Sequence, residues 1–270
     1  MQQQLDQAIE KEQIKEVMDK IKHKIMIMSN KGGVGKSTIT VNIARTFAEK
    51  GNTVGVLDID IHGPSQAKMF GFDGQNIKIN GDKKIVPFNI SDHLKLVTVA
   101  GFLEKEDQPL IWRGPLKISL IKQFIRDVDW GELDYLVIDA PPGTGDEPLT
   151  IGQLVPDMDG VIIVTTPQDI ALLDSKKAIN FVKQLELPVL GLIENMSGLK
   201  CPHCGENIDL FKTDGGKRAA EEMSVDVLGV LPFNQALFHS SESGTFINDE
   251  KVETTNIFKE IVMNLENKIK

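Results

Sequence analysis

The stretch Asn30-Lys31-Gly32-Gly33-Val34-Gly35-Lys36-Ser37-Thr38 decides the fold of this chain. It follows an apolar run, residues 25–28, that predicts a strand, and it precedes residues 39–50, which predict a helix. A glycine-rich turn between strand and helix suits a phosphate, because glycines let successive backbone N–H groups converge on it and the helix dipole adds positive potential. These nine residues therefore predict a nucleotide-binding loop.

Two side chains of the loop have specific roles in this prediction. Lys36 can reach the β- and γ-phosphates, and the hydroxyl of Ser37 can hold Mg²⁺. The usual pattern begins with a glycine where this chain has Asn30, and a second lysine, Lys31, stands beside the glycine pair. A glycine-rich turn that binds nothing is the alternative, but two lysines and Ser-Thr at this spacing argue strongly against it.

This variant loop resembles the deviant Walker A motif of a group of dimeric ATPases that includes nitrogenase iron protein, MinD, ParA and the Mrp-type carriers. In that group the extra lysine reaches a nucleotide phosphate, commonly across a dimer interface. The resemblance therefore implies a homodimer in which Lys31 joins Lys36 in ATP hydrolysis.

Composition narrows the class of protein. The chain has 270 residues, of which 41% are apolar and 26% charged, as expected for one globular α/β domain. No apolar run is long enough to cross a membrane, and the N-terminus fits no secretory signal. The net charge of −9 argues against nonspecific nucleic-acid binding. With two cysteines, we expect a cytoplasmic protein that binds neither membrane nor nucleic acid.

The chain is expected to divide into an N-terminal helical extension, residues 1–24, and an ATPase domain, residues 25–270. Four apolar residues of the extension recur at the spacing i, i+3, i+4, i+7 of one helix face: Ile14, Val17, Met18 and Ile21. We expect that helix to pack on the domain or on a neighbouring subunit. A hairpin insertion is predicted over residues 77–86, and an amphipathic helix that docks on the core over residues 257–269.

Aspartates follow two of the predicted strands. Residues 53–57 lead to Asp58 and Asp60, and residues 134–138 lead to Asp139. The carboxyl ends of parallel strands form the edge where α/β sheets bind ligands. Asp60 is therefore placed to act on the Mg²⁺ shell or the attacking water, and Asp139 to bind Mg²⁺ through water. The alternative is that these aspartates merely end their strands. The nucleotide-binding loop predicted beside them makes this alternative less favoured. The fold predicted is a P-loop NTPase-like α/β fold with a mostly parallel central sheet and helices on both faces.

Adenine is the expected base. The predicted strand over residues 189–193 leads to Asn195, whose side-chain amide both donates and accepts hydrogen bonds and can bind a base edge. The Asn-Lys-x-Asp pattern of GTP-binding proteins is absent from the sequence. Pro232, in the loop 231–233 after the last predicted strand, is a weaker candidate for contact with the base.

The two cysteines, Cys201 and Cys204, allow three interpretations. A thioredoxin-like redox pair lacks its strand-to-helix context here, and two incidental thiols do not account for the spacing. A tetrahedral zinc or a [4Fe–4S] cluster usually takes four protein ligands, and one chain supplies two cysteines. A dimer with twofold symmetry would bring together four cysteines, two from each chain. His203 is a further possible ligand, although a residue between close cysteines more often points outward.

Several motifs together resemble the Mrp/ApbC branch of the deviant Walker A ATPases over residues 25–250. They are Lys-Gly-Gly-Val-Gly-Lys-Ser, Asp-Ile-Asp-Ile-His-Gly-Pro-Ser, Trp-Arg-Gly-Pro from Trp112, Asp-Ala-Pro-Pro-Gly-Thr-Gly-Asp, and Asn-Met-Ser followed by Cys-Pro-His-Cys. The resemblance implies an ATPase that binds Mg²⁺ and ATP, holds a [4Fe–4S] cluster at its dimer interface and passes it to apo-proteins.

Three other functions remain open from the sequence. A MinD- or ParA-like positioning ATPase would need a membrane-binding tail or a basic DNA face. A reductase resembling nitrogenase iron protein would need a cluster cysteine beside the second aspartate, where this chain has Ala140. A structural zinc in the four-thiolate site would keep the dimer and the ATPase but not the carrier function.

Overall fold

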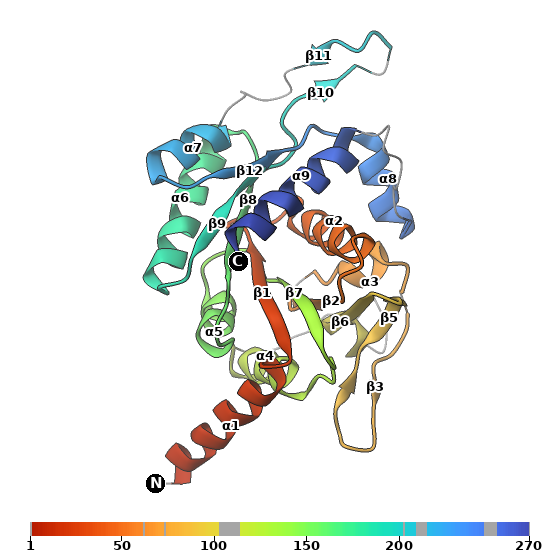
Figure 1. Ribbon diagram of the computed structural model, residues 1–270. Helices are drawn as coiled ribbons and strands as arrows, with labels where there is room; N and C mark the ends of the chain where they lie inside the picture. Colours follow the sequence, from red (N-terminus) through yellow and green to blue (C-terminus); the bar gives the residue numbers. More distant parts are fainter. Residues whose placement is uncertain are drawn as a thin grey trace.

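A central parallel sheet organises the computed structural model, which describes residues 2–61, 63–72, 74–102, 114–201, 203–208, 215–245 and 253–269 (Figure 1). In this part of the chain the sheet has eight strands in the order β12-β9-β8-β1-β7-β2-β6-β5, and every pairing is parallel except β5 with β6. The strands are β1 (Ile21–Met28), β2 (Val54–Asp58), β5 (Phe88–Ser91), β6 (Leu94–Thr98), β7 (Leu133–Asp139), β8 (Gly160–Thr165), β9 (Val189–Glu194) and β12 (Val227–Val230). The predicted fold class is confirmed.

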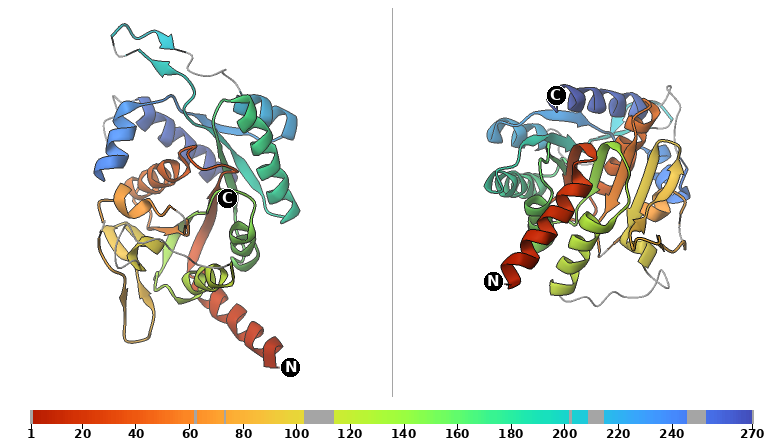
Figure 2. Two further views of the ribbon diagram at one scale, coloured as in Figure 1. Left: turned by 180° about the vertical axis from the view of Figure 1, so that it is seen from behind. Right: turned by 60° about the horizontal axis from the view of Figure 1, so that its bottom comes forward.

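Helices cover both faces of the sheet (Figures 1 and 2). One core joins the sheet to α1, α4, α5 and α6, and the other joins it to α2, α8 and α9. Alternate residues of β1 supply the two cores: Met26 and Met28 face the first, and Ile25 and Ile27 the second. A strand buried on both faces must be apolar throughout, which explains the continuous apolar run in the sequence.

The helices have the following bounds in the described residues: α1 (Gln2–Met18), α2 (Lys36–Glu49), α3 (Gln66–Met69), α4 (Gly114–Asp127), α5 (Asp146–Leu154), α6 (Asp169–Gln184), α7 (Gly215–Met223), α8 (Gln235–Ser243) and α9 (Glu253–Lys268), with a short 3₁₀ helix at Val99–Phe102. The apolar face of α9 is buried against α2 and β12. The predicted docking of the C-terminal helix is confirmed.

The N-terminal prediction is wrong at one position. Helix α1 ends at Met18, and Ile21 begins β1 instead of closing the helix. Ile14 and Met18 are buried against the sheet core, whereas Leu5 and Ile9 are exposed on the half of α1 that projects from the body (Figure 1). Ile21 fits the helical spacing only by coincidence. It is apolar because it begins a buried strand.

Two small antiparallel hairpins stand outside the central sheet. The pair β3 (Lys78–Ile79) and β4 (Ile85–Val86) confirms the predicted insertion. The pair β10 (Leu199–Lys200) and β11 (Asn207–Ile208) projects beyond the body of the molecule (Figures 1 and 2). Trp112 and Arg113 of the Trp-Arg-Gly-Pro motif lie outside the described residues. Among the described helices, none combines the length and apolarity that a membrane span requires.

A partly exposed hydrogen-bond cluster at the start of β7 gives a test of the sheet. Asp134 accepts hydrogen bonds from the amide and hydroxyl of Thr53 and from Lys22. The bond from Lys22 and those from Thr53 lower the pKa of Asp134 to about 2. A carboxylate with a lowered folded-state pKa stabilises the fold above its unfolded pKa of about 4, and this stabilisation is lost as the pH falls towards 2.

We expect Asp134→Asn to lower the free energy of unfolding by roughly 1 kcal/mol at neutral pH, because a charge-assisted acceptor is lost. The difference from wild type should shrink between pH 4 and pH 2. Denaturant titrations across this range measure it, with the exposed Asp92→Asn as the matched control. A difference that stays constant with pH would contradict the assigned role of Asp134.

Candidate functional site

The predicted nucleotide-binding loop connects β1 to α2. Gly33 and Gly35 have φ angles of 80° and 86°, a region that side chains with a Cβ rarely adopt. Gly35 is the N-cap residue of α2, and no side-chain hydrogen bond caps this helix within the described residues. The first N–H groups of α2 are therefore free to receive an anion.

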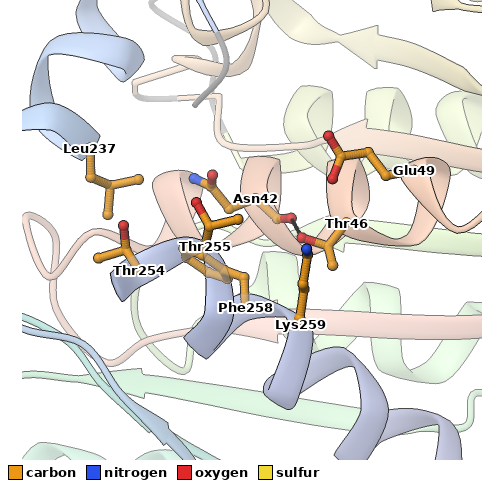
Figure 3. A pocket seen from close by; sticks show the side chains of 8 residues that line it. All are labelled: Asn42, Thr46, Glu49, Leu237, Thr254, Thr255, Phe258 and Lys259. Atoms are coloured by element: carbon orange, nitrogen blue, oxygen red, sulfur yellow. Dashed lines mark hydrogen bonds between the residues drawn. The ribbon is translucent and has the colours of Figure 1, made fainter. Parts of the chain in front are cut away.

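This loop lines an open cleft of about 390 Å³, together with Asp60, Gly63 and Pro142. That volume is within the range of small-molecule sites. A second cavity, between α2, α8 and α9, has about 10 Å³ and holds about one water molecule at most (Figure 3). The cleft at the loop is therefore the stronger candidate for a ligand site of the two.

The carboxyl ends of β2 and β7 place their acids against the loop. Asp58 and Asp139 are partners in the register of the two strands, and Asp139 is 0% exposed. Lys36 Nζ lies 2.5 Å from Asp139 Oδ1 and 3.6 Å from Asp60 Oδ2. Burial lowers the pKa of Lys36, but attraction to Asp139 and Asp60 outweighs it and leaves the pKa raised. The lysine is therefore a cation held among carboxylates.

The third carboxyl group, on Asp58, is fully buried. It accepts hydrogen bonds from the amide of Asp60 and the hydroxyl of Thr98. Burial, followed by repulsion from Asp139, raises the pKa of Asp58 to about 8. Asp139 and Asp60 both lie near the single ammonium group of Lys36, so carboxyl groups outnumber cations in this cluster and it favours a further cation.

The oxygen atoms present fit Mg²⁺, which prefers carboxylate, hydroxyl and water ligands. Asp60 Oδ1 and Gln66 Oε1 are buried and find no hydrogen-bond partner among the residues that the structure describes. Unpaired buried oxygens are rare because each costs free energy. Here they indicate that the site is completed by a hydrogen-bond donor, which either a ligand or a hydrated cation can supply.

The second lysine of the loop has a partner on α6. Lys31 Nζ lies 2.6 Å from Asp174 Oδ2, and Asn30 Nδ2 donates to Asp174 Oδ1 at 2.9 Å. The hydrogen bond from Lys31 is the main cause of a lowered pKa at Asp174, although burial opposes it. The side chain of Lys31 is 46% exposed, so it can exchange this carboxylate for another anion.

Asn195 packs against the loop in this structure. Its Nδ2 donates to the carbonyl of Val34 at 2.9 Å, and a Cβ on Gly35 would collide with the same amide. Glycine is therefore required at position 35 for close approach as well as for its φ angle. Pro232 is half-buried just after β12, in the segment joined to the Asn195 strand by the bond from Leu231 N to Glu194 O. The roles of Asn195 and Pro232 towards a base remain predictions.

The cysteines lie on the turn of the projecting hairpin, apart from the cleft. Cys204 is exposed and Cys201 half-buried, and both thiols are free. The N–H groups of Cys204 and His203 and the thiol of Cys204 lower the pKa of Cys201, which favours a thiolate ligand. Within the described ranges no cluster of three or more His, Cys, Asp or Glu side chains has the geometry of a metal site.

The structure brings together Lys36, Ser37 and Asp60 at the cleft, with Asp139 directly behind them. It also reveals two residues that sequence analysis missed, Gln66 and Asp174. Gln66 follows the Asp60 segment and offered no motif, and Asp174 lies inside an ordinary amphipathic helix. Only spatial proximity identifies them.

Comparisons with known proteins agree on one family. The family model for ParA proteins described as NUBPL iron-transfer P-loop NTPases matches residues 20–266. An iron-sulfur cluster carrier protein of Methanocaldococcus jannaschii is 47% identical over 256 residues, which cover 95% of this chain and 88% of that protein. The cytosolic Fe-S cluster assembly factor NUBP2 homolog of Dictyostelium discoideum is 46% identical, with 84% of this chain and 87% of that protein covered.

Solved structures have the same fold. A nucleotide-binding protein of Archaeoglobus fulgidus in complex with ADP superposes with a TM-score of 0.76 at 36% identity and covers 87% of this chain and 91% of that one. The cell division ATPase MinD of Pyrococcus furiosus superposes with a TM-score of 0.66 at 20% identity, with coverages of 91% and 98%. This second similarity shows the fold alone.

The buried ion pair predicts a large effect on stability. Lys36→Met leaves Asp139 buried without its cation, so we expect it to lower the free energy of unfolding by about 3 kcal/mol or more. The double variant Lys36→Met/Asp139→Leu removes both charges and should regain most of that loss.

Denaturant unfolding without nucleotide measures this difference, and Lys31→Met is the matched control. Lys31 is half-exposed, so its loss should cost less than about 1 kcal/mol. Equal losses for Lys36→Met and Lys31→Met would contradict the assignment of Lys36 as the counter-ion of Asp139.

Proposed function

The chain belongs to the family of NUBPL iron-transfer P-loop NTPases, and on this premise we propose that it is an ATP-hydrolysing carrier of [4Fe–4S] clusters. It holds a cluster between two copies of the chain and passes it to apo-proteins. The observation that carries the proposal is the pair of free thiols on a projecting hairpin, half-buried Cys201 and exposed Cys204, in a chain that also has a phosphate-binding cleft.

A cluster shared by two chains follows from the number of ligands. A [4Fe–4S] cluster takes four thiolates, and each copy of this chain offers two. The hairpin leaves the sheet after β9, from the carboxyl edge that also carries the nucleotide-binding loop. A partner that approaches this edge therefore meets the cysteines and Lys31 together. The cluster is cargo, held at the surface where an acceptor protein can reach it.

ATP is proposed to occupy the cleft. Residues 30–38 surround its phosphates with backbone N–H groups, while Lys36 and Lys31 supply positive charge. Ser37, Asp60 and Asp139 hold Mg²⁺, which would neutralise charge on the β- and γ-phosphates when bound. Asp60, with one buried unpaired oxygen, accepts a hydrogen bond from the attacking water or from a water bound to the cation. Asn195 and Pro232 contact adenine.

Hydrogen bonds connect the nucleotide-binding loop to the hairpin. Asn195 binds the carbonyl of Val34, and two residues later Ser197 N donates to Leu231 O. The amide of Phe233 then donates to Gly198 O, at the base of the cysteine hairpin. A nucleotide that displaces Asn195 from the loop would thus move the hairpin base. ATP binding would in this way change how firmly the pair of cysteines holds the cluster.

The partners proposed are a second copy of the chain and apo iron–sulfur proteins, in the cytoplasm. Relatives in Dictyostelium and Kluyveromyces are named cytosolic assembly factors. Neither a membrane nor nucleic acid is proposed as a partner, because the net charge of −9 disfavours binding to an anionic surface.

Anaerobic reconstitution with iron and sulfide tests the carrier function. We expect about four irons and four sulfides per dimer, with broad visible absorption, because four thiolates complete the cluster. Cys201→Ala and Cys204→Ala should each lose this absorption, whereas His203→Ala, at an exposed position between them, should keep it. One tightly bound zinc per dimer with no sulfide would contradict the carrier function and leave a structural clamp.

Asp60 gives a separate test of the ATPase. Asp60→Asn keeps the size of the side chain but weakens an acceptor for water, so we expect kcat to fall by roughly 100-fold. The cluster content should stay close to wild type, because the cysteine pair is unchanged. Steady-state phosphate release measures kcat. An unchanged kcat would show that Asp60 does not act in hydrolysis.

A further inference from the structure

A glutamine behind the nucleotide-binding cleft has no role in the functions assigned so far. Gln66 is the first residue of α3, and its side chain is 0% exposed. Its Nε2 donates to Asp139 Oδ2 at 2.7 Å and to the carbonyl of Ser37 at 3.2 Å. One side chain thus connects the end of β7 with the first turn of α2, the elements that supply two of the proposed Mg²⁺ ligands, Asp139 and Ser37.

These two contacts fix the orientation of the amide. Both partners of Nε2, a carboxylate oxygen and a peptide carbonyl, can only accept hydrogen bonds. The reversed amide would place its own oxygen against two acceptors, so the orientation found is the one that chemistry requires. The backbone amide of Gln66 also donates to Asp58 Oδ2, at 3.4 Å. The residue is therefore held at both its backbone and its side chain.

The fixed amide leaves its oxygen without a donor. Gln66 Oε1 is buried and has no hydrogen-bond partner among the described residues. Leaving a buried acceptor unpaired costs free energy, so such an atom indicates a missing donor. Because Oε1 and Nε2 share one carbon, Oε1 lies within about 5 Å of Asp139 Oδ2. One water molecule spans a gap of this size.

A second unpaired oxygen lies in the same cluster. Asp60 Oδ1 also has no partner, while Asp60 Oδ2 faces Lys36 Nζ at 3.6 Å and that Nζ in turn contacts Asp139. Protein side chains therefore present two buried acceptors and an excess of negative charge around one carboxylate. A hydrated divalent cation supplies positive charge and several O–H donors at once.

We propose that Gln66 is a positioning residue of the Mg²⁺ site. Its Nε2 holds Asp139 and the first turn of α2 at a fixed separation, and its Oε1 accepts a hydrogen bond from a water of the Mg²⁺ hydration shell. The proposal rests on the nucleotide site of the proposed function but not on the cluster. It assigns the outer hydration of the metal to a residue six positions after Asp60.

The test measures how strongly Mg²⁺ tightens nucleotide binding. The full-length chain is titrated with a fluorescent ATP analogue in EDTA and then at increasing Mg²⁺. The Mg²⁺ midpoint is the Mg²⁺ concentration that gives half of this tightening. For Gln66→Leu we expect the midpoint to rise about tenfold, which corresponds to a loss of about 1.4 kcal/mol. The affinity for the ATP analogue in EDTA, without Mg²⁺, should change less than about twofold. A merely structural residue would change both or neither.

Two further variants make the outcome decisive. Gln184→Leu makes the same chemical change at an exposed position at the end of α6, and it should leave the Mg²⁺ midpoint unchanged. Gln66→Met keeps the length of the side chain but removes both the donor and the acceptor, so it should raise the midpoint as Gln66→Leu does, which keeps the test valid if Gln66→Leu does not fold.

A wild-type midpoint in Gln66→Leu or in Gln66→Met would overturn the proposal. If wild type itself bound no nucleotide, the proposed ATPase function would fail, which is a separate outcome from the failure of the Gln66 assignment.

Discussion

The ion pair between Lys36 and Asp139 is the interaction on which the site depends. It joins the first residue of α2 to the last residue of β7, and Asp139 is 0% exposed. A buried carboxylate without a partner is expensive, so the chain needs this lysine before any nucleotide binds. A phosphate that attracts Lys36 takes the counter-ion away from Asp139. Only another cation can replace it there, and this is the physical reason why nucleotide and Mg²⁺ would bind together.

The parallel sheet explains why so much of the site follows from the sequence. Strands β1, β2, β7 and β9 all end at one edge, so residues after each apolar run must gather there. The glycine loop, Asp60, Asp139 and Asn195 were predicted by this rule. The same rule does not predict which atoms pair. Asn195 was expected to contact a base, yet in this structure its amide binds the carbonyl of Val34. The sequence indicates the edge, and packing determines the partners.

What the sequence did not predict depends on contacts between distant segments. Gln66 lies 73 positions before Asp139, and Asp174 lies 144 positions after Asn30. Neither residue belongs to a periodic pattern or a motif, and a buried glutamine looks like a surface glutamine in sequence. The start of β1 was missed for a different reason. Ile21 satisfies the helical spacing of α1 and the two-residue spacing of a strand, and only pairing with Leu133 of β7 decides between them.

The arrangement of charges also bears on the proposed dimer. Lys31 is the exposed lysine of the loop, and its partner Asp174 belongs to the same chain. A salt bridge this exposed contributes little stability, so a more negative group such as a phosphate can replace Asp174 at small cost. The cysteine hairpin rises from the same edge of the sheet and presents half of a four-thiolate site. Two copies that meet at this edge would bring Lys31 to a nucleotide and complete the thiolate set in one movement. The nucleotide and the cluster would then stabilise the same dimer, and each would alter the affinity for the other without touching it.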